Sequence, residues 1–448
     1  MDAAVAIEVS EAGLLALRAS GPAVEVPAVA LVEGDTVVTG AAAAATARLK
    51  PVFTSDRFLA ELSQLPLPQP SPRARTTADL AWETVAELVR GLGGEVVGAV
   101  AALPSHWRGA QAGLFVALAR AAGLPLAGLV DAAVAATAAL PARELLFLDV
   151  DLHQARVVRL GGAARLQRLQ VEFTPRVGLK ALHAAWALAI AETFVRRTRF
   201  DPLHDGASEQ RLHAALPHWL QQLQVEPSID AGLEHGGGTA TVPLSRDQLL
   251  LASEAYYTQL VELVARVHRD GEHLTLALHD RAGLPGLVAR LAGRRRLDIV
   301  QLPREAVAAG AQCAAAELMA AGADRVCLAL SRSAEVVPEP LAAPQREVTE
   351  QPTHLLYAGH AHKISTAPLV VGRAPAALRA LVVTGPPEGL SRRHCSVFLE
   401  DGHAIVVDHS RHGTFLNGTR VIGRAPLAAG DSLRLGVPGA VLDLVAVS

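Results

Sequence analysis

The chain has 448 residues, of which 50% are hydrophobic and 19% charged, and its formal net charge is −3. This length exceeds the size at which single cores divide, so two or more domains are expected. A charge so near zero argues against general affinity for nucleic acid or anionic membrane. Cys313, Cys327 and Cys395 have neither metal-ligand nor redox spacing, which predicts buried free thiols in a reducing compartment.

The sequence also gives no signal for export or membrane insertion. The first residues include Asp2, Glu8 and Glu11 without an early basic residue, which is not the pattern of a signal peptide. No uncharged apolar run reaches the length that spans a bilayer. We therefore expect a cytoplasmic protein without a membrane span.

Predicted strands alternate with predicted helices up to about residue 335. In chain order they are a hairpin over 4–20, a strand over 94–104, a helix over 107–123, a hairpin over 144–160, a helix over 249–271 and a strand over 273–279. Such alternation is typical of an α/β fold. The hairpin recurs after about 140 residues, which indicates two related halves.

The composition then changes twice. Residues 336–353 contain four prolines among Glu and Gln, with no apolar period, which predicts an extended linker. Beyond it, short alternating segments such as 395–410 are separated by Gly, Pro and Asn turns, the pattern of an all-β sandwich. We therefore expect an α/β domain at 1–335, a linker at 336–353 and an all-β domain at 354–448.

Three stretches of the all-β region could together hold a phosphate. They are Val371–Arg373, Leu390–His394 and Asp408–Gly418. Binding a phosphate through side chains needs a bidentate guanidinium, a hydroxyl donor and a second cation on loops at one end of a rigid scaffold. Arg373, Ser391 with Arg392, and Arg411 supply these groups. Asn417-Gly418 predicts a tight hairpin that fixes the register of the strands beneath the loops.

These stretches resemble the motifs of the forkhead-associated (FHA) family. That family has Gly-Arg, then Ser-x-x-His, then Ser-x-Asn-Gly-Thr followed by Asn-Gly. Here the corresponding residues are Gly372-Arg373, Ser391-Arg392-Arg393-His394, Ser410-Arg411-His412-Gly413-Thr414 and Asn417-Gly418. The resemblance implies an FHA sandwich at residues 354–448 that binds phosphothreonine on a partner protein.

The resemblance also implies a role for each matching residue. Arg373 and Ser391 would hold the phosphate with Arg392 as a supporting donor, while Arg411 and His412 would face the peptide backbone. The matching structural positions are Gly372, His394, Gly413, Asn417 and Gly418, of which His394 would tie a loop rather than touch the ligand. His412 stands where the family has Asn, and its imidazole has a different reach and plane. We therefore expect an altered affinity or peptide preference. The alternative is a sandwich that kept its fold and lost its ligand.

Residues 1–335 resemble the ATPase domain of the heat-shock 70 chaperones, in the actin-like superfamily. The resemblance rests on the apolar patterning of residues 102–140, 242–267 and 304–318. It implies an actin-like fold of two related lobes.

The nucleotide motifs of that family are degenerate in this chain. In the family, Gly-rich turns of two hairpins let backbone N–H groups approach the phosphates of ATP. The corresponding turns here, Glu8–Ala12 and Asp149–Gln154, contain no glycine. We expect their side chains to fill the phosphate space, with Glu11 and Asp151 adding repulsion. The adenosine-site Gly-Gly of the family is His279-Asp280 here, and its active-site lysine is replaced by Asp56.

Three acids of the family's site persist. Glu8 and Asp149 match its metal-facing carboxylates, and Asp131 matches its catalytic Glu. They could be a remnant magnesium site or solvated carboxylates at strand ends, and the missing glycines favour the second interpretation. We therefore expect a pseudo-ATPase with no metal, no cofactor and no catalytic residue.

These observations favour a non-enzymatic signalling adaptor. It would capture a phosphothreonine protein, either a substrate of a Ser/Thr kinase or the kinase itself, and dock other proteins through residues 1–335. The alternatives are an active heat-shock-70-like ATPase recruited by its FHA domain, and an actin-superfamily assembly protein. Thr349, an acid-flanked linker residue, is either an ordinary polar residue, which short motifs of this kind favour, or a phosphorylation site whose phosphate the sandwich could bind.

Overall fold

In the computed structural model the described residues are 4–269, 272–294, 296–332, 351–375, 377–383, 390–400, 402–417, 419–421, 423–436 and 440–446. Most of the predicted linker, with Thr349, lies outside them, as does Gly418. The chain forms two compact units. The first comprises residues 1–222, 230–243 and 252–341, and the second joins 342–448 with the short segments 223–229 and 244–251.

The first unit begins with a six-stranded sheet of order β16-β8-β7-β1-β2-β3. Its strands are β1 (Val5–Val9), β2 (Gly13–Leu17), β3 (Val24–Pro27), β7 (Ala99–Leu103), β8 (Leu126–Asp131) and β16 (Val326–Cys327). β1 is antiparallel to β2 and parallel to β7, which is parallel to β8. Every residue of β1 and β7 is buried, as expected for strands covered on both faces.

A second six-stranded sheet has the order β15-β14-β9-β10-β11-β17. Its strands are β9 (Glu144–Val150), β10 (Ala155–Gly161), β11 (Arg165–Thr174), β14 (Leu274–Leu278), β15 (Leu297–Gln301) and β17 (Ala329–Ser331). β9 is antiparallel to β10 and parallel to β14, which is parallel to β15. Both sheets therefore contain an antiparallel three-stranded meander and two further strands parallel to its first strand. The sixth strand differs, because β16 is parallel to β8 whereas β17 is antiparallel to β11. The two predicted hairpins are confirmed, and the recurrence extends to five strands of each sheet.

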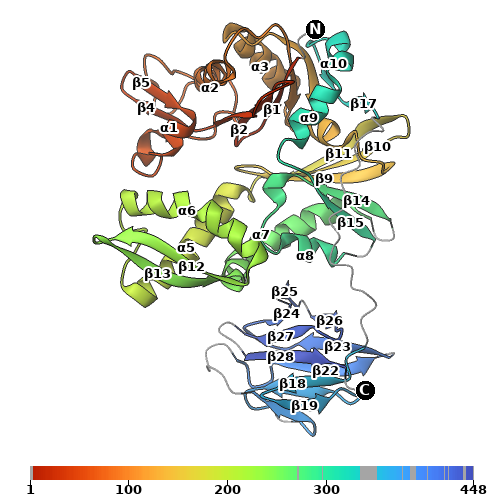
Figure 1. Ribbon diagram of the computed structural model, residues 1–448. Coiled ribbons are helices and arrows are strands. Elements are labelled where there is room, and N and C mark those ends of the chain that lie inside the picture. Colours follow the sequence, from red (N-terminus) through yellow and green to blue (C-terminus); the bar gives the residue numbers. More distant parts are fainter. Residues whose placement is uncertain are drawn as a thin grey trace. The chain divides into compact units, whose positions relative to one another are not determined.

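Helices and smaller elements complete this part of the chain (Figure 1). They are β4 (Ala30–Glu33), β5 (Thr36–Thr39), α1 (Gly40–Ala44), η1 (Pro51–Phe53), β6 (Thr54–Ser55), α2 (Thr77–Leu92), α3 (Gly109–Ala121), α4 (Ala132–Thr137), α5 (Leu179–Thr198), α6 (Gly206–Val225), β12 (Ser228–His235), β13 (Gly238–Ser245), α7 (Arg246–Val267), η2 (Asp280–Ala282), α8 (Leu287–Ala292), α9 (Ala306–Cys313) and α10 (Ala315–Ala321). The predicted helices over 107–123 and 249–271 are thus confirmed as α3 and α7, with ends that differ by a few residues. α2 begins with a capping box, in which the Asp79 carboxylate accepts the Thr76 N–H while the Thr76 hydroxyl accepts the Asp79 N–H.

The two sheets of the first unit share one hydrophobic core. It includes Ala6 of β1 and Phe147 of β9. Helices α4 and α9 pack so closely that a Cβ atom at Gly310 would lie only 1.9 Å from the carbonyl oxygen of Ala135. Glycine at position 310 permits this approach. The α/β class predicted for this region is confirmed, and the actin-like family stays a prediction.

The C-terminal region is a sandwich of two sheets, of orders β19-β18-β28-β27-β24-β25 and β21-β20-β22-β23-β26. The strands are β18 (His354–Tyr357), β19 (His360–Lys363), β20 (Leu369–Gly372), β21 (Ala380–Val382), β22 (Cys395–Glu400), β23 (His403–Asp408), β24 (Thr414–Leu416), β25 (Thr419–Arg420), β26 (Arg424–Pro426), β27 (Ser432–Leu435) and β28 (Ala440–Val445). Val371, Val397 and Leu435 lie in its hydrophobic core. The prediction of an all-β domain is confirmed.

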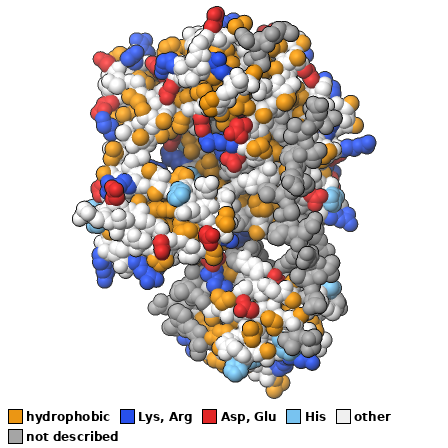
Figure 2. Space-filling view, viewed as in Figure 1, with side chains coloured by type: hydrophobic (Ala, Val, Ile, Leu, Met, Phe, Trp, Pro, Cys, Tyr) orange, Lys and Arg blue, Asp and Glu red, His pale blue; other side chains and the backbone are white. Residues whose placement is uncertain are grey.

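Three features relate to predictions made from composition, namely the mixture of charges on the surface, the possibility of a membrane span and the burial of the cysteines. On the visible face, basic and acidic side chains are interspersed with hydrophobic ones (Figure 2). Among the described helices, none has both the length and the apolar character needed to cross a bilayer. All three cysteines are free thiols, but Cys313 is exposed and only Cys395 is buried, so the prediction of buried thiols is wrong for Cys313.

Candidate functional site

Three loops meet at one end of the C-terminal sandwich. β20 is antiparallel to β22, with Val371 opposite Cys395, and β22 is antiparallel to β23, with Cys395 opposite Asp408. The residues that follow β20, precede β22 and follow β23 therefore lie at the same end of this sheet. These are the three stretches that the sequence singled out.

Ser391 connects the three loops. Its carbonyl oxygen accepts the Arg373 N–H at 3.0 Å, and its Oγ accepts the Arg411 N–H at 3.2 Å. Its own N–H donates to Nδ1 of His394 at 3.1 Å. A serine hydroxyl has one hydrogen to donate besides its acceptor positions. Ser391 is thus held by both neighbouring loops while its O–H hydrogen has no acceptor among the described residues.

His394, on the core side of the loops, joins two of them by hydrogen bonds. Because its Nδ1 accepts a hydrogen bond, its Nε2 carries the proton and donates to the carbonyl oxygen of Gly413 at 2.9 Å. The ring is completely buried, and burial lowers its pKa. His394 is therefore a neutral structural residue that does not reach the surface.

Three further residues shape the loop end. A Cβ atom at Gly372 would lie 2.2 Å from the carbonyl oxygen of Arg392, so only glycine permits this close approach of two loops. Gly413 has φ = +84°, which also favours glycine. Asn417 donates through Nδ2 to Asp431 at 2.7 Å and accepts the Ser432 N–H at 2.8 Å, which joins the end of β24 to the start of β27.

Four basic or imidazole side chains at this end are exposed. They are Arg373, Arg392, Arg411 and His412. Within the described part of the chain, none of these side chains makes a hydrogen bond or an ion pair. Guanidinium groups donate bidentate hydrogen bonds to phosphate oxygens. The structure therefore brings all five predicted phosphothreonine-site residues, these four and Ser391, to one surface.

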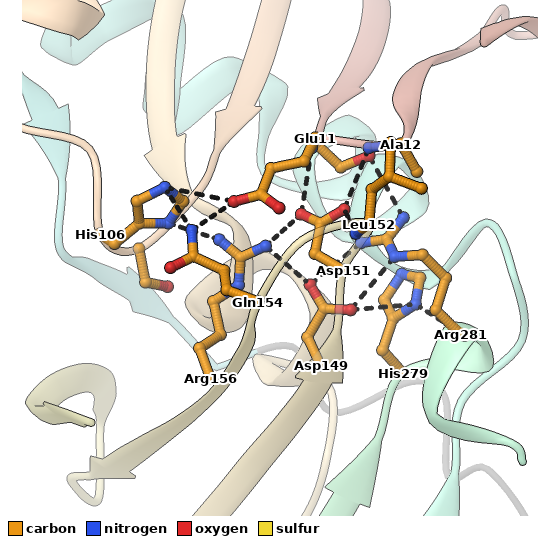
Figure 3. Close-up of polar contacts among 12 residues, drawn as sticks. Glu11, Ala12, His106, Asp149, Asp151, Leu152, Gln154, Arg156, His279 and Arg281 are labelled. Atoms are coloured by element: carbon orange, nitrogen blue, oxygen red, sulfur yellow. Dashed lines mark hydrogen bonds and ion pairs between the residues drawn. The ribbon is translucent and has the colours of Figure 1, made fainter. Parts of the chain in front are cut away.

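The predicted nucleotide turns face each other in the N-terminal region (Figure 3). The Asp151 carboxylate of the β9–β10 turn accepts the backbone N–H groups of Glu11 and Ala12, both at 3.0 Å. In return, the Glu11 carboxylate accepts the His153 N–H at 2.9 Å and a hydrogen bond from the Gln154 side chain. Each turn thus binds a carboxylate of the other. Glu11 and Asp151 therefore each accept hydrogen bonds from the opposite turn, a structural role that the prediction of repulsion did not include.

Arg281 of η2 bridges the two predicted metal-facing acids. Its Nη1 donates to Glu8 at 2.7 Å, and its Nε and Nη2 donate to Asp149 at 3.1 and 3.0 Å. Arg156 contacts Asp149 at 3.3 Å and also pairs with Asp151. A guanidinium therefore lies between the carboxylates that would face a metal ion. Arg281 was not among the predicted site residues, although a cation just after the apolar strand β14 was a usable signal.

The ionisation of these acids follows from their surroundings. Burial alone would raise the pKa of Glu8, but Arg281 and His279 beside it lower this pKa to about 2. Burial likewise opposes ionisation of Asp149, yet Arg281, His279 and Arg156 hold its pKa well below its usual range. Glu8 is only 3% exposed and Asp149 only 5%, so the prediction of solvated carboxylates is wrong for both.

Little space remains beside the predicted metal-facing acids. The cavity lined by Glu8, Ser10, Asp149 and Arg281 has a volume of about 10 Å³, roughly what one water molecule needs. Among the described residues, no group of three or more His, Cys, Asp or Glu side chains is arranged to hold a metal ion.

Asp131 has a structural environment as well. Its Oδ1 accepts the Ala133 N–H at 3.0 Å at the start of α4 and the Ser105 hydroxyl at 2.9 Å. Its Oδ2 pairs with Arg168 at 2.7 Å. Burial raises its pKa, which Arg168 opposes. Asp131 is 1% exposed, so it is a buried helix cap and not the solvated carboxylate that was expected.

Of the three remaining predicted positions, only His279 joins the buried network of Glu8, Asp149 and Arg281. His279 is buried, accepts the Arg281 N–H at 3.2 Å and directs Nε2 toward Glu8 at 3.4 Å. Asp280 is exposed and does not join the network. Asp56 pairs with Lys180 and accepts through its backbone carbonyl from His153 at 2.9 Å.

Comparison with known proteins identifies one part of the chain. A family model of the FHA domain matches residues 369–436. The matched segment runs from β20 to just beyond β27 and contains all three loops of the candidate phosphate site, which confirms the FHA resemblance of the C-terminal region. No curated protein matches the chain.

Proposed function

We propose that this protein binds phosphothreonine on partner proteins through its FHA domain and acts as a non-enzymatic signalling adaptor. The observation that carries the proposal is the convergence of Arg373, Ser391 and Arg411 at one exposed loop end. A phosphate monoester carries about two negative charges near neutral pH. It would accept charge-assisted hydrogen bonds from the guanidinium groups and from the Ser391 hydroxyl.

The loops are ordered by contacts that leave these donors available. Bonds to Ser391 fix the loops of Arg373 and Arg411, and His394 fixes the same loop end from the core. Such preorganisation reduces the entropy that binding would cost. We infer that the partner is a substrate of a Ser/Thr kinase or the kinase itself, because only a kinase supplies phosphothreonine.

This function is tested by fluorescence anisotropy on the full-length protein. One labelled peptide is prepared with phosphothreonine, phosphoserine or threonine at the same position. We expect binding of the phosphothreonine form and at least about tenfold weaker binding of the other two. Equal binding of the phosphorylated and unphosphorylated peptides would contradict the proposal.

We propose further that the N-terminal domain docks proteins without binding nucleotide. Three features support the absence of nucleotide. First, backbone N–H groups of each turn donate to a carboxylate of the opposite turn. Second, Arg281 lies between Glu8 and Asp149. Third, the cavity beside these acids has room for about one water molecule. An active heat-shock-70-like ATPase would need this network to open, and an assembly protein would show a molecular mass that rises with concentration.

A further inference from the structure

Arg393 lies in the loop of Ser391 but has no part in the phosphate contacts that the FHA resemblance implies. Its side chain is exposed, and its Nη2 lies 3.2 Å from Nε2 of His409. Oγ of Ser396 lies 2.9 Å from the same nitrogen. A guanidinium can only donate, so Nε2 of His409 accepts and the imidazole is neutral with its proton on Nδ1. Burial and the neighbouring Arg393 lower the pKa of His409, in agreement with this state.

The contact with His409 orients Arg393 without neutralising it. His409 directly follows β23 and begins the loop that carries Arg411, so Arg393 is held beside that loop at the end where Ser391 lies. One bond to His409 uses one of the five N–H donors of a guanidinium. No carboxylate among the described residues pairs with Arg393, so within this part of the chain its remaining donors are open to a ligand.

The loop end carries more positive charge than one phosphate needs. It has Arg373, Arg392, Arg393 and Arg411, whereas Asp408, a described acid at the same end, points an oxygen at internal donors. Oδ1 of Asp408 accepts the backbone N–H of residue 410 at 3.0 Å and the hydroxyl of residue 414 at 2.8 Å. The acidic residue at position 388 lies outside the described residues. Two guanidinium groups and a hydroxyl suffice to neutralise and bind one phosphate dianion.

This excess is a local property of the chain. Residues 354–448 contain nine basic and six acidic residues, against 32 and 38 in residues 1–353, which gives net charges of +3 and −6. The region that carries the candidate site is thus net positive because acidic residues are scarcer there, while basic residues are about as frequent as in the rest of the chain. Clustered charge of one sign selects ligands of the opposite sign.

We propose that Arg393, positioned by His409, binds a second anionic group next to the phosphothreonine of the partner. The partner segment is therefore a phosphothreonine peptide with an anionic neighbour, whether the carboxylate of Asp or Glu or a second phosphate. The inference rests on the proposed phosphothreonine binding and adds a specificity-determining residue to it.

The test measures the affinity of the full-length protein for four peptides by calorimetry at physiological ionic strength. The first has phosphothreonine flanked by Ala, the second has it flanked by Asp, and the third carries a second phosphothreonine beside the first. The fourth is the Asp-flanked peptide with unmodified threonine. We expect the second and third to bind about two- to fivefold tighter than the first, as an exposed charge pair provides. The fourth should bind weakest, and comparison of the second with the third distinguishes carboxylate from phosphate as the preferred neighbour.

Substitution assigns the preference to its residue. In Arg393→Gln, the affinity ratio of the Asp-flanked to the Ala-flanked phosphopeptide should fall to about one. The matched control is Arg424→Gln, which removes one charge from β26, where Arg424 pairs with Glu400, and should keep the ratio.

The outcomes separate the two proposals. If none of the phosphopeptides binds, phosphothreonine recognition fails and this inference fails with it. If the Ala-flanked and anion-flanked phosphopeptides bind equally well, or if Arg393→Gln retains the preference, this inference alone is overturned.

Discussion

The turns of the N-terminal hairpins and the loops of the C-terminal sandwich carry the same kinds of hydrogen-bond donor. The arginine donors are bonded to buried acids in the first and exposed in the second. In both places backbone N–H groups and arginines converge. At the N-terminal turns, Asp151 and Glu11 accept the backbone donors, and Arg281 is bonded to two buried acids. At the C-terminal loops, internal bonds fix the backbone while the side chains of Arg373 and Arg411 stay exposed.

The difference shows how one chain can place anion-binding groups in structural and in recognition roles. A buried arginine paired with carboxylates contributes to a fixed arrangement, and removing it leaves uncompensated charges in a low dielectric. An exposed arginine without a carboxylate partner contributes little to stability and remains available for a ligand. Stability should therefore depend on the first set, and phosphopeptide affinity on the second.

The largest expected effect separates these two sets. Arg281→Ala leaves Glu8 and Asp149 without their main partner and should lower the free energy of unfolding by about 3–5 kcal/mol. Arg373→Ala changes an exposed side chain and should alter the free energy of unfolding by less than about 0.5 kcal/mol. Chemical denaturation of both variants measures this contrast, and equal stabilities would show that the buried network is not structural.

A second prediction concerns acid unfolding. The pKa of Glu8 is about 2 in the folded protein and 4.5 ordinarily, so its ionised form favours folding above pH 4.5, and this contribution disappears as the pH falls to about 2. Each pKa unit is worth about 1.4 kcal/mol, so the contribution is roughly 3–4 kcal/mol. The stability difference between wild type and Glu8→Gln should therefore shrink over this pH range. A difference that stays constant would contradict the pairing of Glu8 with Arg281.

The smallest expected effect is the response to nucleotide. A ligand at one hundred times its dissociation constant stabilises a folded protein by about 2.7 kcal/mol. Because side chains fill the space between the two turns, millimolar ATP with magnesium should leave the melting temperature of the protein unchanged. A reproducible rise that Asp149→Ala abolishes would identify an ATP-binding protein and overturn the proposal that the domain binds no nucleotide.

The features that the sequence predicted are those with local signals. Alternating apolar residues define the two hairpins, and short motifs place Arg373, Ser391 and Arg411 on loops at one end of a sandwich. Asp131 could also have been predicted as a helix cap, because an acid directly before an Ala-rich helix is a common cap.

The features that the sequence did not predict depend on long-range contacts. Arg281 meets Glu8 and Asp149 across 273 and 132 residues of chain, and no local pattern reports such a meeting. The reciprocal contacts of Glu11 and Asp151 span 140 residues or more. Solvated carboxylates were therefore expected where the folded chain brings arginines to buried acids.

The most direct test of the account is the affinity of full-length wild type and Arg373→Ala for one phosphothreonine peptide, measured by calorimetry. Loss of a charge-assisted phosphate contact costs about 2 kcal/mol, which corresponds to about thirtyfold in the dissociation constant. We predict a loss of at least this size, with Arg424→Ala as a control of unchanged affinity. Equal affinities of wild type and Arg373→Ala would contradict the assignment of the C-terminal loops as a phosphothreonine site.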